Sequence, residues 1–281
     1  MIKNRIKTVK VLDTKIECKD VKTITLNMEG LQTQNYPEPL PGQFLMIWVP
    51  GIDEIPMSIS GIDDEGNWQI TVKKVGDCTK KLFNLEKEEF LGFRGPLGNN
   101  FSIPTNQNSK IFLVGGGTGL APLRFLSQKL TSEDFEFILL EGAKLKKELI
   151  YINEFENNFN NSNFYICTED GSYGKKGLVT ETFHSLLNEY SKSKNKIYVY
   201  SCGPEKMLYE VYHLSERVNV ELQVSLERIM RCGCGLCGLC SIDPVGFLVC
   251  KDGPIFTMKQ LKKMDDFGKF KRDFSGKKIQ I

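Results

Sequence analysis

Hydrophobic residues follow two different spacings along the chain, and the change falls near residue 106. Before it, short segments alternate apolar and polar residues and are separated by turns that contain Gly and Pro. An alternation with a period of two predicts half-buried strands. The predicted strands include residues 22–28, 43–49, 68–75 and 90–94. Many short strands with this punctuation predict a small antiparallel β barrel over residues 1–105.

After residue 106, short apolar segments alternate with segments whose apolar residues lie three or four positions apart. The predicted strands are residues 110–114, 135–140, 163–168, 196–202 and 220–226, and the predicted helices are residues 121–130, 178–189 and 205–217. Strand–helix alternation predicts a doubly wound, parallel α/β domain over residues 106–220. An asparagine-rich stretch at 157–163 is expected to be a polar surface loop. Residues 221–281 form a third module, a cysteine-rich loop with a polar tail.

The composition indicates the class of protein and the cellular compartment. Its 281 residues are 41% apolar and 26% charged, which is ordinary for a soluble globular protein. The net charge of +2 implies no general attraction to nucleic acid or to a membrane surface. No apolar run reaches the ~20 residues of a membrane span. Nine cysteines without a secretory signal indicate a reducing cytoplasm.

Four cysteines near the C-terminal end carry the strongest chemical signal. Their spacing is C-x4-C-x2-C, followed by a fourth cysteine after nine further residues. This is close to the plant-type pattern that holds a [2Fe–2S] cluster. Glycines lie between the thiols, so the backbone can wrap tightly and direct N–H groups at sulfur. The predicted ligands are Cys232, Cys237, Cys240 and Cys250.

Other uses of cysteine fit this pattern less well. A zinc ribbon would need two C-x2-C pairs about 15–20 residues apart, and only Cys237 and Cys240 form such a pair. The cysteine spacing typical of [4Fe–4S] sites is absent, and disulfide frameworks suit small secreted chains. Structural zinc therefore stays the main alternative to a [2Fe–2S] cluster. Cys234 is interpreted as a loop residue and not a ligand. The scattered thiols, each interpreted as a reduced, buried small side chain, are Cys18, Cys78, Cys167 and Cys202.

A glycine-rich turn joins the first predicted strand of the α/β domain to its helix. Glycines let a diphosphate approach the backbone, and the helix start offers free N–H groups and the positive end of its dipole. The turn departs from the strict G-x-G-x-x-G pattern, because Leu120 occupies the third glycine of one register. By itself the turn could be structural. The residues assigned to nucleotide binding here are Gly115, Gly116, Gly117, Thr118 and Gly119.

Two further loops are expected at the carboxyl ends of strands, where a doubly wound sheet binds ligands. One contains Asp170 and Gly171, and the other contains Cys202, Gly203 and Pro204. A crevice between these loops would suit a dinucleotide. The acidic pair at 169–170 would repel a 2′-phosphate and favours NAD over NADP weakly, because the lysines at 144, 146 and 147 argue the other way.

A flavin is expected on chemical grounds. A nicotinamide carries two electrons at once as hydride, whereas a [2Fe–2S] cluster passes one, and flavin chemistry converts between the two. The candidate site lies in the barrel, in segments that would otherwise be ordinary strands and turns. The residues assigned to it are Ile55, Pro56, Met57, Ser58, Val72, Lys73, Lys74, Cys78 and Thr79.

The order of these motifs resembles a known superfamily. A barrel, then Gly-Gly-Gly-Thr-Gly-Leu-Ala-Pro-Leu at 115–123, then Cys-Gly-Pro at 202–204, resembles the ferredoxin–NADP reductases. The cysteine spacing followed by Lys-Asp-Gly-Pro-Ile-Phe at 251–256 narrows the resemblance to the electron-transfer subunits of dihydroorotate dehydrogenase B. Residues 40–44, 95–99 and 170–174 are also similar to that family, so the resemblance covers nearly the whole chain.

The resemblance implies FAD in the barrel, NAD in the α/β domain and one [2Fe–2S] cluster on the four cysteines. It also implies a separate catalytic subunit that oxidises dihydroorotate with its own FMN, in a heterotetramer of two of each subunit. The family's Arg-Pro-x-Ser flavin motif has Ile55 at the arginine position, and its Gly-Thr pair is Cys78-Thr79. Lys73, Lys74 or a backbone amide is expected to replace the arginine.

The expected function is an electron conduit in the synthesis of UMP. Electrons would pass from the partner's FMN through the cluster and FAD to NAD⁺, with Ser58 near the reactive N5 of the flavin. One alternative is the small subunit of a ferredoxin–NADP oxidoreductase or sulfide dehydrogenase complex, and another is a zinc-stapled binding module without redox chemistry. The basic tail at 259–281 is expected to be a solvated surface, or else a docking segment for the catalytic subunit.

Overall fold

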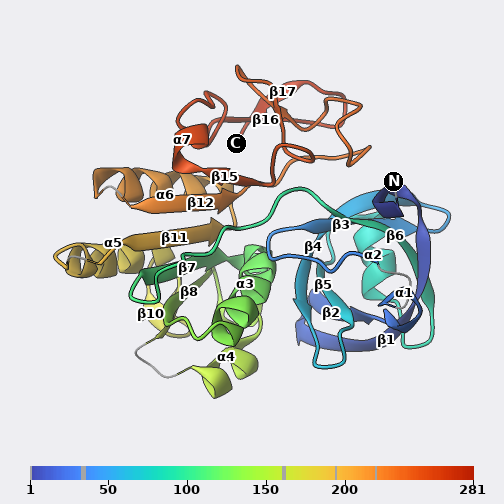
Figure 1. Cartoon of the computed structure of the whole chain (residues 1–281), viewed down its shortest axis with the longest axis horizontal. Coiled ribbons are helices and arrows are strands. Elements are labelled where there is room, and N and C mark those ends of the chain that lie inside the picture. The colour runs from blue at the N-terminus through green and yellow to red at the C-terminus, as the bar shows by residue number, and fades with distance from the viewer. Residues whose placement is uncertain (1, 33–35, 160–162, 194, 219) are drawn as a thin grey trace.

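The computed structural model describes residues 2–32, 36–159, 163–193, 195–218 and 220–281. The chain begins with a β barrel, continues into an α/β sheet domain beside it, and ends in a segment that contacts both (Figure 1).

The barrel closes from six antiparallel strands in the order β1-β2-β5-β4-β3-β6. The bounds are β1 Lys7–Cys18, β2 Val21–Leu26, β3 Phe44–Val49, β4 Asp53–Ile62, β5 Trp68–Lys73 and β6 Phe90–Leu97. Inward-facing positions are apolar, and Val11, Ile24, Leu45 and Phe93 are buried in the barrel core. The predicted barrel is therefore confirmed. Three short helical elements accompany it, namely η1 (Ile2–Asn4), α1 (Glu29–Gln32) and α2 (Asp77–Phe83).

The α/β domain is built on a seven-stranded sheet in the order β10-β9-β8-β7-β11-β12-β15. The strands are β7 Lys110–Gly116, β8 Phe137–Ala143, β9 Phe164–Thr168, β10 Lys175–Lys176, β11 Ile197–Cys202, β12 Glu221–Ser225 and β15 Ile255–Thr257. All neighbours are parallel except β12 and β15, which pair antiparallel. The helical elements are η2 Gly117–Gly119, α3 Leu120–Ser132, η3 Lys146–Glu148, α4 Ile152–Asn158, α5 Val179–Tyr190 and α6 Glu205–Arg217.

Strand β7 shows why helices cover both faces of this sheet. Ile111 and Leu113 belong to the apolar cluster that contains the buried leucines of α3 and Phe155 of α4. Phe112 and Val114, which point the other way, belong to the cluster that contains those of α5 and α6. A strand buried on both faces reads as a continuous apolar run. The predicted doubly wound domain is thereby confirmed.

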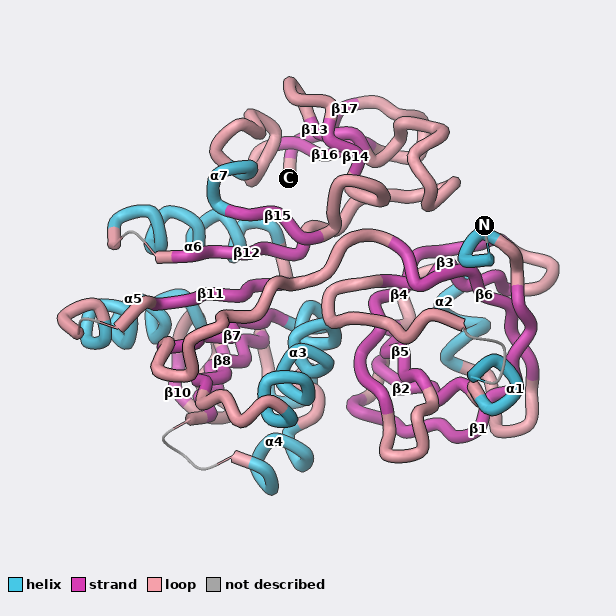
Figure 2. The backbone as a smooth tube through the Cα atoms, in the orientation of Figure 1, coloured by secondary structure: helices cyan, strands magenta, loops and turns pink. Residues whose placement is uncertain are grey.

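The C-terminal segment is mostly loop, as Figure 2 shows, but it is more structured than the predicted polar tail. It contains β13 (Ser241–Ile242), β14 (Phe247–Leu248), α7 (Met258–Leu261), β16 (Phe270–Arg272) and β17 (Lys278–Gln280). The sheet of the α/β domain continues past residue 220, because both β12 and β15 belong to it. The predicted division of the chain at residue 220 stays a prediction. The third predicted segment supplies β15, an edge strand, to the sheet of the α/β domain.

The asparagine-rich stretch differs from its predicted loop. Asn157 and Asn158 lie within α4, while residues 160–162 lie outside the described part of the chain. Helix α4 was missed because its 7 residues are too few to show a helical period.

Candidate functional site

The carboxyl ends of four neighbouring parallel strands meet at one edge of the sheet. In the strand register, Cys202 lies opposite Gly115, and Ala143 of β8 lies opposite Thr168 of β9. The loops that follow β7, β8, β9 and β11 therefore leave the sheet at nearly the same level. All three loops predicted to bind a dinucleotide lie at this edge, where open α/β sheets bind ligands.

The glycine turn and the loop 202–204 are in direct contact. A Cβ atom at Gly119 would lie 2.4 Å from the carbonyl oxygen of Cys202, and one at Gly116 would lie 2.9 Å from Cδ of Pro204. Gly117 differs, because its φ is +53° and no atom lies within 4 Å of its Cβ position. Its backbone is therefore open to a close approach by a ligand. The same two loops contain Gly115, Thr118 and Gly203.

Loops 143–148 and 168–174 are joined through Ser172. The Ser172 hydroxyl donates to the Asp170 carboxylate at 2.7 Å and its N–H does so at 2.9 Å, which lowers the pKa of Asp170. Ser172 Oγ in turn accepts the N–H of Lys146 at 2.8 Å. The Lys146 ammonium lies 4.4 Å from the centre of the Tyr173 ring. The acidic and basic side chains that gave opposite indications on NAD and NADP thus share one edge, beside Gly171.

Three predicted flavin segments meet around the start of α2. Val75 and Gly76 donate their N–H groups to Oγ1 of Thr79 at 2.9 and 2.8 Å, which folds the segment after β5 onto the helix. The Cys78 sulfur accepts the N–H of Asp53 at the start of β4, although burial raises the pKa of Cys78 overall. The lysine-bearing segment, the helix start and the β4 strand are therefore neighbours, as a flavin site would require.

Side chains of the β4 segment alternate between the barrel core and its outside. Ile55 and Met57 pack against the barrel core, and Pro56 and Ser58 take the alternate positions. Val72 is fully buried in the core of the barrel. Only its backbone is therefore available to a ligand.

The two lysines expected to replace the family arginine differ in their surroundings. Lys74 Nζ lies 3.5 Å from the Asp20 carboxylate and 4.8 Å from the centre of the Phe83 ring. Lys73 is exposed, and no carboxylate among the described residues forms an ion pair with it. The charge of Lys73 is thus the freer of the two to meet a diphosphate.

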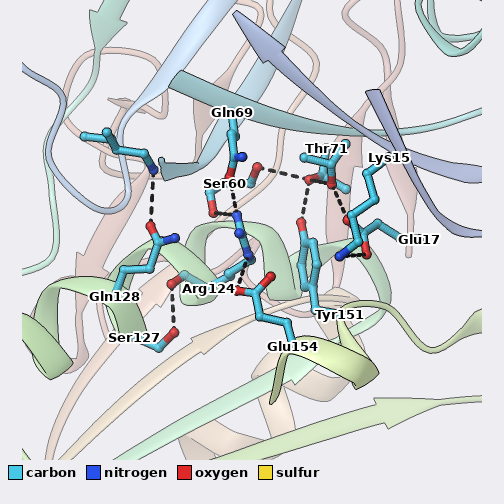
Figure 3. A network of polar contacts seen from close by, with 12 residues as sticks. Lys15, Glu17, Ser60, Gln69, Thr71, Arg124, Ser127, Gln128, Tyr151 and Glu154 are labelled. Atoms are coloured by element: carbon cyan, nitrogen blue, oxygen red, sulfur yellow. Dashed lines mark hydrogen bonds and ion pairs between the residues drawn. The ribbon is translucent and has the colours of Figure 1, made fainter. Parts of the chain in front are cut away.

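A polar network that the sequence does not reveal joins the barrel to the α/β domain (Figure 3). From α3, Nη1 of Arg124 donates to the carbonyl oxygen of Ser60 at 3.0 Å and to Oε1 of Gln69 at 2.7 Å. Its Nε forms an ion pair with Glu154 of α4 at 2.6 Å. One arginine, with only 10% of its side chain exposed, thus connects two helices with two barrel strands.

Tyr151 makes a second connection in the same network (Figure 3). Its hydroxyl bonds to Oγ1 of Thr71 at 2.5 Å, and Thr71 also bonds to Oγ of Ser60 at 3.0 Å. Burial raises the pKa of Tyr151, so the hydroxyl stays protonated. The backbone φ of Tyr151 is +59°, a left-handed conformation that costs about 1–3 kcal/mol outside glycine. The surrounding contacts hold this residue at the interface despite that cost.

The four predicted ligand cysteines lie in two pairs. The Cys237 thiol donates to the Cys232 sulfur, and the Cys250 thiol donates to the Cys240 sulfur. Burial opposes ionisation of Cys232, yet N–H groups of Cys234, Cys237 and Leu236 lower its pKa to about 6. The Cys250 contact lowers the pKa of Cys240 to about 7 and, in return, raises that of Cys250. One thiol of each pair, Cys232 and Cys240, therefore favours the thiolate form that binds metal.

This donor set fits an iron–sulfur cluster better than one metal ion. In the described part of the chain, no three His, Cys, Asp or Glu side chains gather closely enough for a single ion. Two thiol pairs instead match two irons held by two cysteines each. The N–H groups of Leu236 and Cys237 point at the Cys232 sulfur at 3.2 and 3.4 Å, and such hydrogen bonds are a normal feature of cluster sites.

The remaining cysteines follow the prediction only in part. All nine cysteines are free. Cys167 is buried as predicted, but Cys18, Cys78 and Cys202 are half-buried, so that part of the prediction was wrong. Cys234 is also half-buried, and burial followed by the charge of Cys232 raises its pKa.

Two motifs that were singled out far apart in the sequence contact each other. Asn99, after β6, donates from Nδ2 to the carbonyl oxygens of Asp252 and Ile255 at 3.0 and 2.8 Å, and accepts the Ile255 N–H at 2.9 Å. A Cβ atom at Gly98 would lie 2.6 Å from Cδ of Pro254. The barrel and the segment after Cys250, the last of the predicted ligands, are thereby held together.

Comparison with protein families gives two matches. Residues 227–262 match the iron–sulfur cluster binding domain of dihydroorotate dehydrogenase B, and residues 113–212 match the oxidoreductase NAD-binding domain. These matches cover the cysteine loop and most of the α/β domain. No helix in the described part of the chain has the length and apolar character needed to cross a membrane.

Curated relatives cover nearly the full length. A protein of Methanocaldococcus jannaschii is 40% identical over 239 residues, which is 85% of this chain and 87% of that protein. One of Thermoplasma acidophilum is 36% identical over 279 residues, or 99% and 98% of the two chains. Both are named probable dihydroorotate dehydrogenase B (NAD(+)), electron transfer subunit.

Solved structures extend the similarity to the fold. An NADH-dependent reduced ferredoxin–NADP oxidoreductase, studied for flavin-based electron bifurcation, superposes with a TM-score of 0.76 at 27% identity. The superposition covers 91% of this chain and 92% of that one. A ferredoxin–NADP⁺ reductase of Plasmodium falciparum, at 19% identity and a TM-score of 0.59, shares the fold over 74% of this chain and 89% of its own.

Proposed function

Because the chain belongs to the electron-transfer subunits of dihydroorotate dehydrogenase B, we propose that its sites act in series between a catalytic partner subunit and NAD⁺. The partner would oxidise dihydroorotate with its own FMN, within pyrimidine synthesis. When bound here, a [2Fe–2S] cluster supplies single-electron transfer and FAD supplies the conversion to the hydride that NAD⁺ accepts. This chain's own residues bind these groups and keep them close together.

The position of the cysteine loop against the barrel carries this proposal. A Cβ atom at Gly233, which follows the first ligand cysteine, would lie 2.6 Å from Cγ of Met46 on β3. Met46 pairs with Pro56 of β4 in the barrel. The loop thus packs one strand away from the predicted flavin segment, so the two redox groups would be neighbours within one chain.

The nucleotide would bind at the carboxyl edge of the sheet. The open backbone at Gly117 and the first turn of α3 offer N–H groups to a diphosphate. Loop 202–204, pressed against the glycine turn, would orient the nicotinamide towards the barrel. The proposed nucleotide contacts are Gly115, Gly116, Gly117, Thr118, Gly119, Asp170, Gly171, Cys202, Gly203 and Pro204.

The flavin would bind where β4, the segment after β5 and the start of α2 meet. Ser58 would lie near N5 of the flavin, and Lys73 would take over the diphosphate contact of the family arginine. The Arg124 network would hold the barrel and the nucleotide domain in a fixed relative position, which hydride transfer between their ligands requires. The proposed flavin contacts are Ile55, Pro56, Met57, Ser58, Val72 through its backbone, Lys73, Lys74, Cys78 and Thr79.

The catalytic subunit would dock beside the cysteine loop. Leu236 lies within that loop and is 85% exposed, and Phe274 in the tail is 69% exposed. The Arg231 guanidinium lies 5.9 Å from the centre of the Phe274 ring. Large exposed apolar side chains next to a redox site suit a protein interface. We propose a heterotetramer with two copies of each subunit, in the cytoplasm, where free thiols persist.

Two measurements test this function. The purified chain should contain one flavin and about two irons, and anaerobic NADH should bleach the flavin and then reduce the cluster, detected by electron paramagnetic resonance. A chain that binds zinc and no chromophore would refute the proposal. A second candidate, a subunit of a ferredoxin–NADP oxidoreductase, is favoured by the 27% identity noted above. Co-purification with a dihydroorotate-oxidising subunit argues for the first, and NADPH-dependent ferredoxin reduction argues for the second.

A further inference from the structure

Arg94 of β6 connects the predicted flavin strand to the first cluster cysteine. Its guanidinium forms two hydrogen bonds with the carboxylate of Glu54 on β4, Nε to Oε1 and Nη2 to Oε2, both at 2.6 Å. The same Nη2 donates to the backbone carbonyl of Cys232 at 3.1 Å. Glu54 immediately precedes the segment 55–58. One side chain thus contacts both redox segments.

Close packing holds the cysteine loop against the barrel beside Arg94. Gly233, next to Cys232, lies so close to the barrel that a Cβ atom there would be 2.9 Å from Sδ of Met46 and 3.5 Å from Cδ1 of Leu97. Its φ of +64° also favours glycine. Met46 and Arg94 are opposite residues in the β3–β6 ladder. The cysteine loop therefore rests on the strands that carry and adjoin Arg94.

The charge of Arg94 is shielded from solvent. Only 12% of the Arg94 side chain and 19% of the Glu54 side chain are exposed. A bidentate arginine–carboxylate pair in such surroundings is strong and fixed in orientation. The guanidinium remains charged at every relevant pH, and its charge interacts favourably with the thiolate forms of both Cys232 and Cys234. Interactions of this kind are weakly screened when the groups are buried.

We propose that Arg94 is a positioning residue that fixes the cysteine loop on the flavin strand and stabilises the reduced cluster. Reduction adds a negative charge to the cluster, and the fixed positive charge beside Cys232 favours that state. The net charge and hydrogen bonding around a cluster are known determinants of its potential. Glu54 holds the guanidinium in the orientation in which it reaches the Cys232 carbonyl. The inference rests on the proposed cluster, and on Cys232 as its ligand.

The test compares two variants of Arg94 with a control in the loaded, full-length chain. Arg94→Gln removes the charge, Arg94→Lys keeps the charge but loses the bidentate geometry, and Arg217→Gln removes an exposed arginine at the end of α6. Iron per chain is measured first, followed by a redox titration of the cluster monitored by electron paramagnetic resonance. The titration reports the cluster directly and does not depend on turnover.

Arg94→Gln should shift the cluster potential to more negative values than in the unaltered chain and in Arg217→Gln. Arg94→Lys should shift it less, because the charge stays. A loaded Arg94→Gln whose potential equals that of Arg217→Gln would overturn the inference. If Arg94→Gln loses iron, Arg94→Lys decides the question. A cluster potential and spectrum of Arg94→Lys identical to those of the unaltered chain would then overturn the inference. Absence of iron from the unaltered chain would instead refute the proposed function.

Discussion

Replacement of Arg124 by methionine tests whether a single buried side chain joins the barrel to the nucleotide domain. The substitution keeps an unbranched, apolar side chain in place of the aliphatic part of arginine and removes the guanidinium with its charge. It would break the ion pair with Glu154 at 2.6 Å and the bonds to the Ser60 carbonyl and Gln69 at 3.0 and 2.7 Å. Glu154, with 22% of its side chain exposed, would keep its charge without its partner.

The expected loss of stability follows from this burial. Removing one partner of a buried ion pair costs about 3–5 kcal/mol. Because Glu154 retains some access to water, we expect the lower end, about 3 kcal/mol, which is a large part of a typical total of about 5–15 kcal/mol. The matched control is Lys129→Met on the same helix. Its exposed pair with Glu133, at 2.8 Å, should contribute under about 0.5 kcal/mol.

The assay is equilibrium denaturation with urea, followed by both tryptophan fluorescence and circular dichroism. Arg124→Met should unfold at a clearly lower urea concentration than Lys129→Met. The double variant Arg124→Met/Glu154→Gln should recover part of the loss, because it also removes the unpaired carboxylate. If Arg124→Met and Lys129→Met unfold at the same urea concentration, the network of Figure 3 does not stabilise the interface as argued.

Three further predictions address the separate sites. Gly119→Ala should weaken NADH binding and destabilise the chain, since its Cβ would lie 2.4 Å from the Cys202 carbonyl oxygen. The control Gly30→Ala, whose added Cβ would meet no atom within 4 Å, should leave NADH affinity unchanged. Isothermal titration with NADH checks this, and equal affinities of the two variants would contradict it. Ser at Cys237 should abolish the cluster, whereas Ser at Cys234 should retain about two irons per chain; iron loss in both variants would make Cys234 a ligand. Burial raises the pKa of Glu141 from 4.5 to about 8 in the folded chain. The folded state therefore holds a proton that the unfolded state has lost, and stability should fall by about 1.4 kcal/mol per pH unit as the pH rises through this window. Glu141→Gln keeps an acceptor for the Ile150 N–H and should remove this fall of stability with pH. If the unfolding free energy of the variant depends on pH as that of the unaltered chain does, Glu141 is not the group responsible.

The regular elements and the pairing of the four cysteine thiols have local patterns in the sequence, which is why both could be predicted from it. The apolar run at 110–114 predicts a strand, and the structure confirms it as β7, which is buried on both faces. The cysteine spacing predicts four ligands, and the structure brings those four thiols together in two pairs. In both cases the signal lies within a few residues.

Contacts between distant segments have no such pattern. Arg94, Arg124 and Tyr151 look like ordinary residues of strands, helices and their ends in sequence. The role of Arg94 arises only when the cysteine loop lies on the barrel, and those of Arg124 and Tyr151 only when the barrel lies beside the sheet domain. Val72 shows the opposite case. Its place in the sequence suggested a contact with the flavin, but its side chain fills the barrel core and only its backbone is accessible to a ligand. Burial at such a position depends on which face of a strand the residue occupies in the closed barrel.

The measurement that tests the central proposal most directly is dihydroorotate-dependent reduction of NAD⁺ by the reconstituted complex. The chain is co-purified with the catalytic subunit, and NADH formation is followed by absorbance. We predict NADH formation that requires both subunits and is lost in Cys237→Ser, while the catalytic subunit still oxidises dihydroorotate with an artificial acceptor. NADH formation at an undiminished rate by the Cys237→Ser complex, or none by the fully loaded complex, would contradict the account.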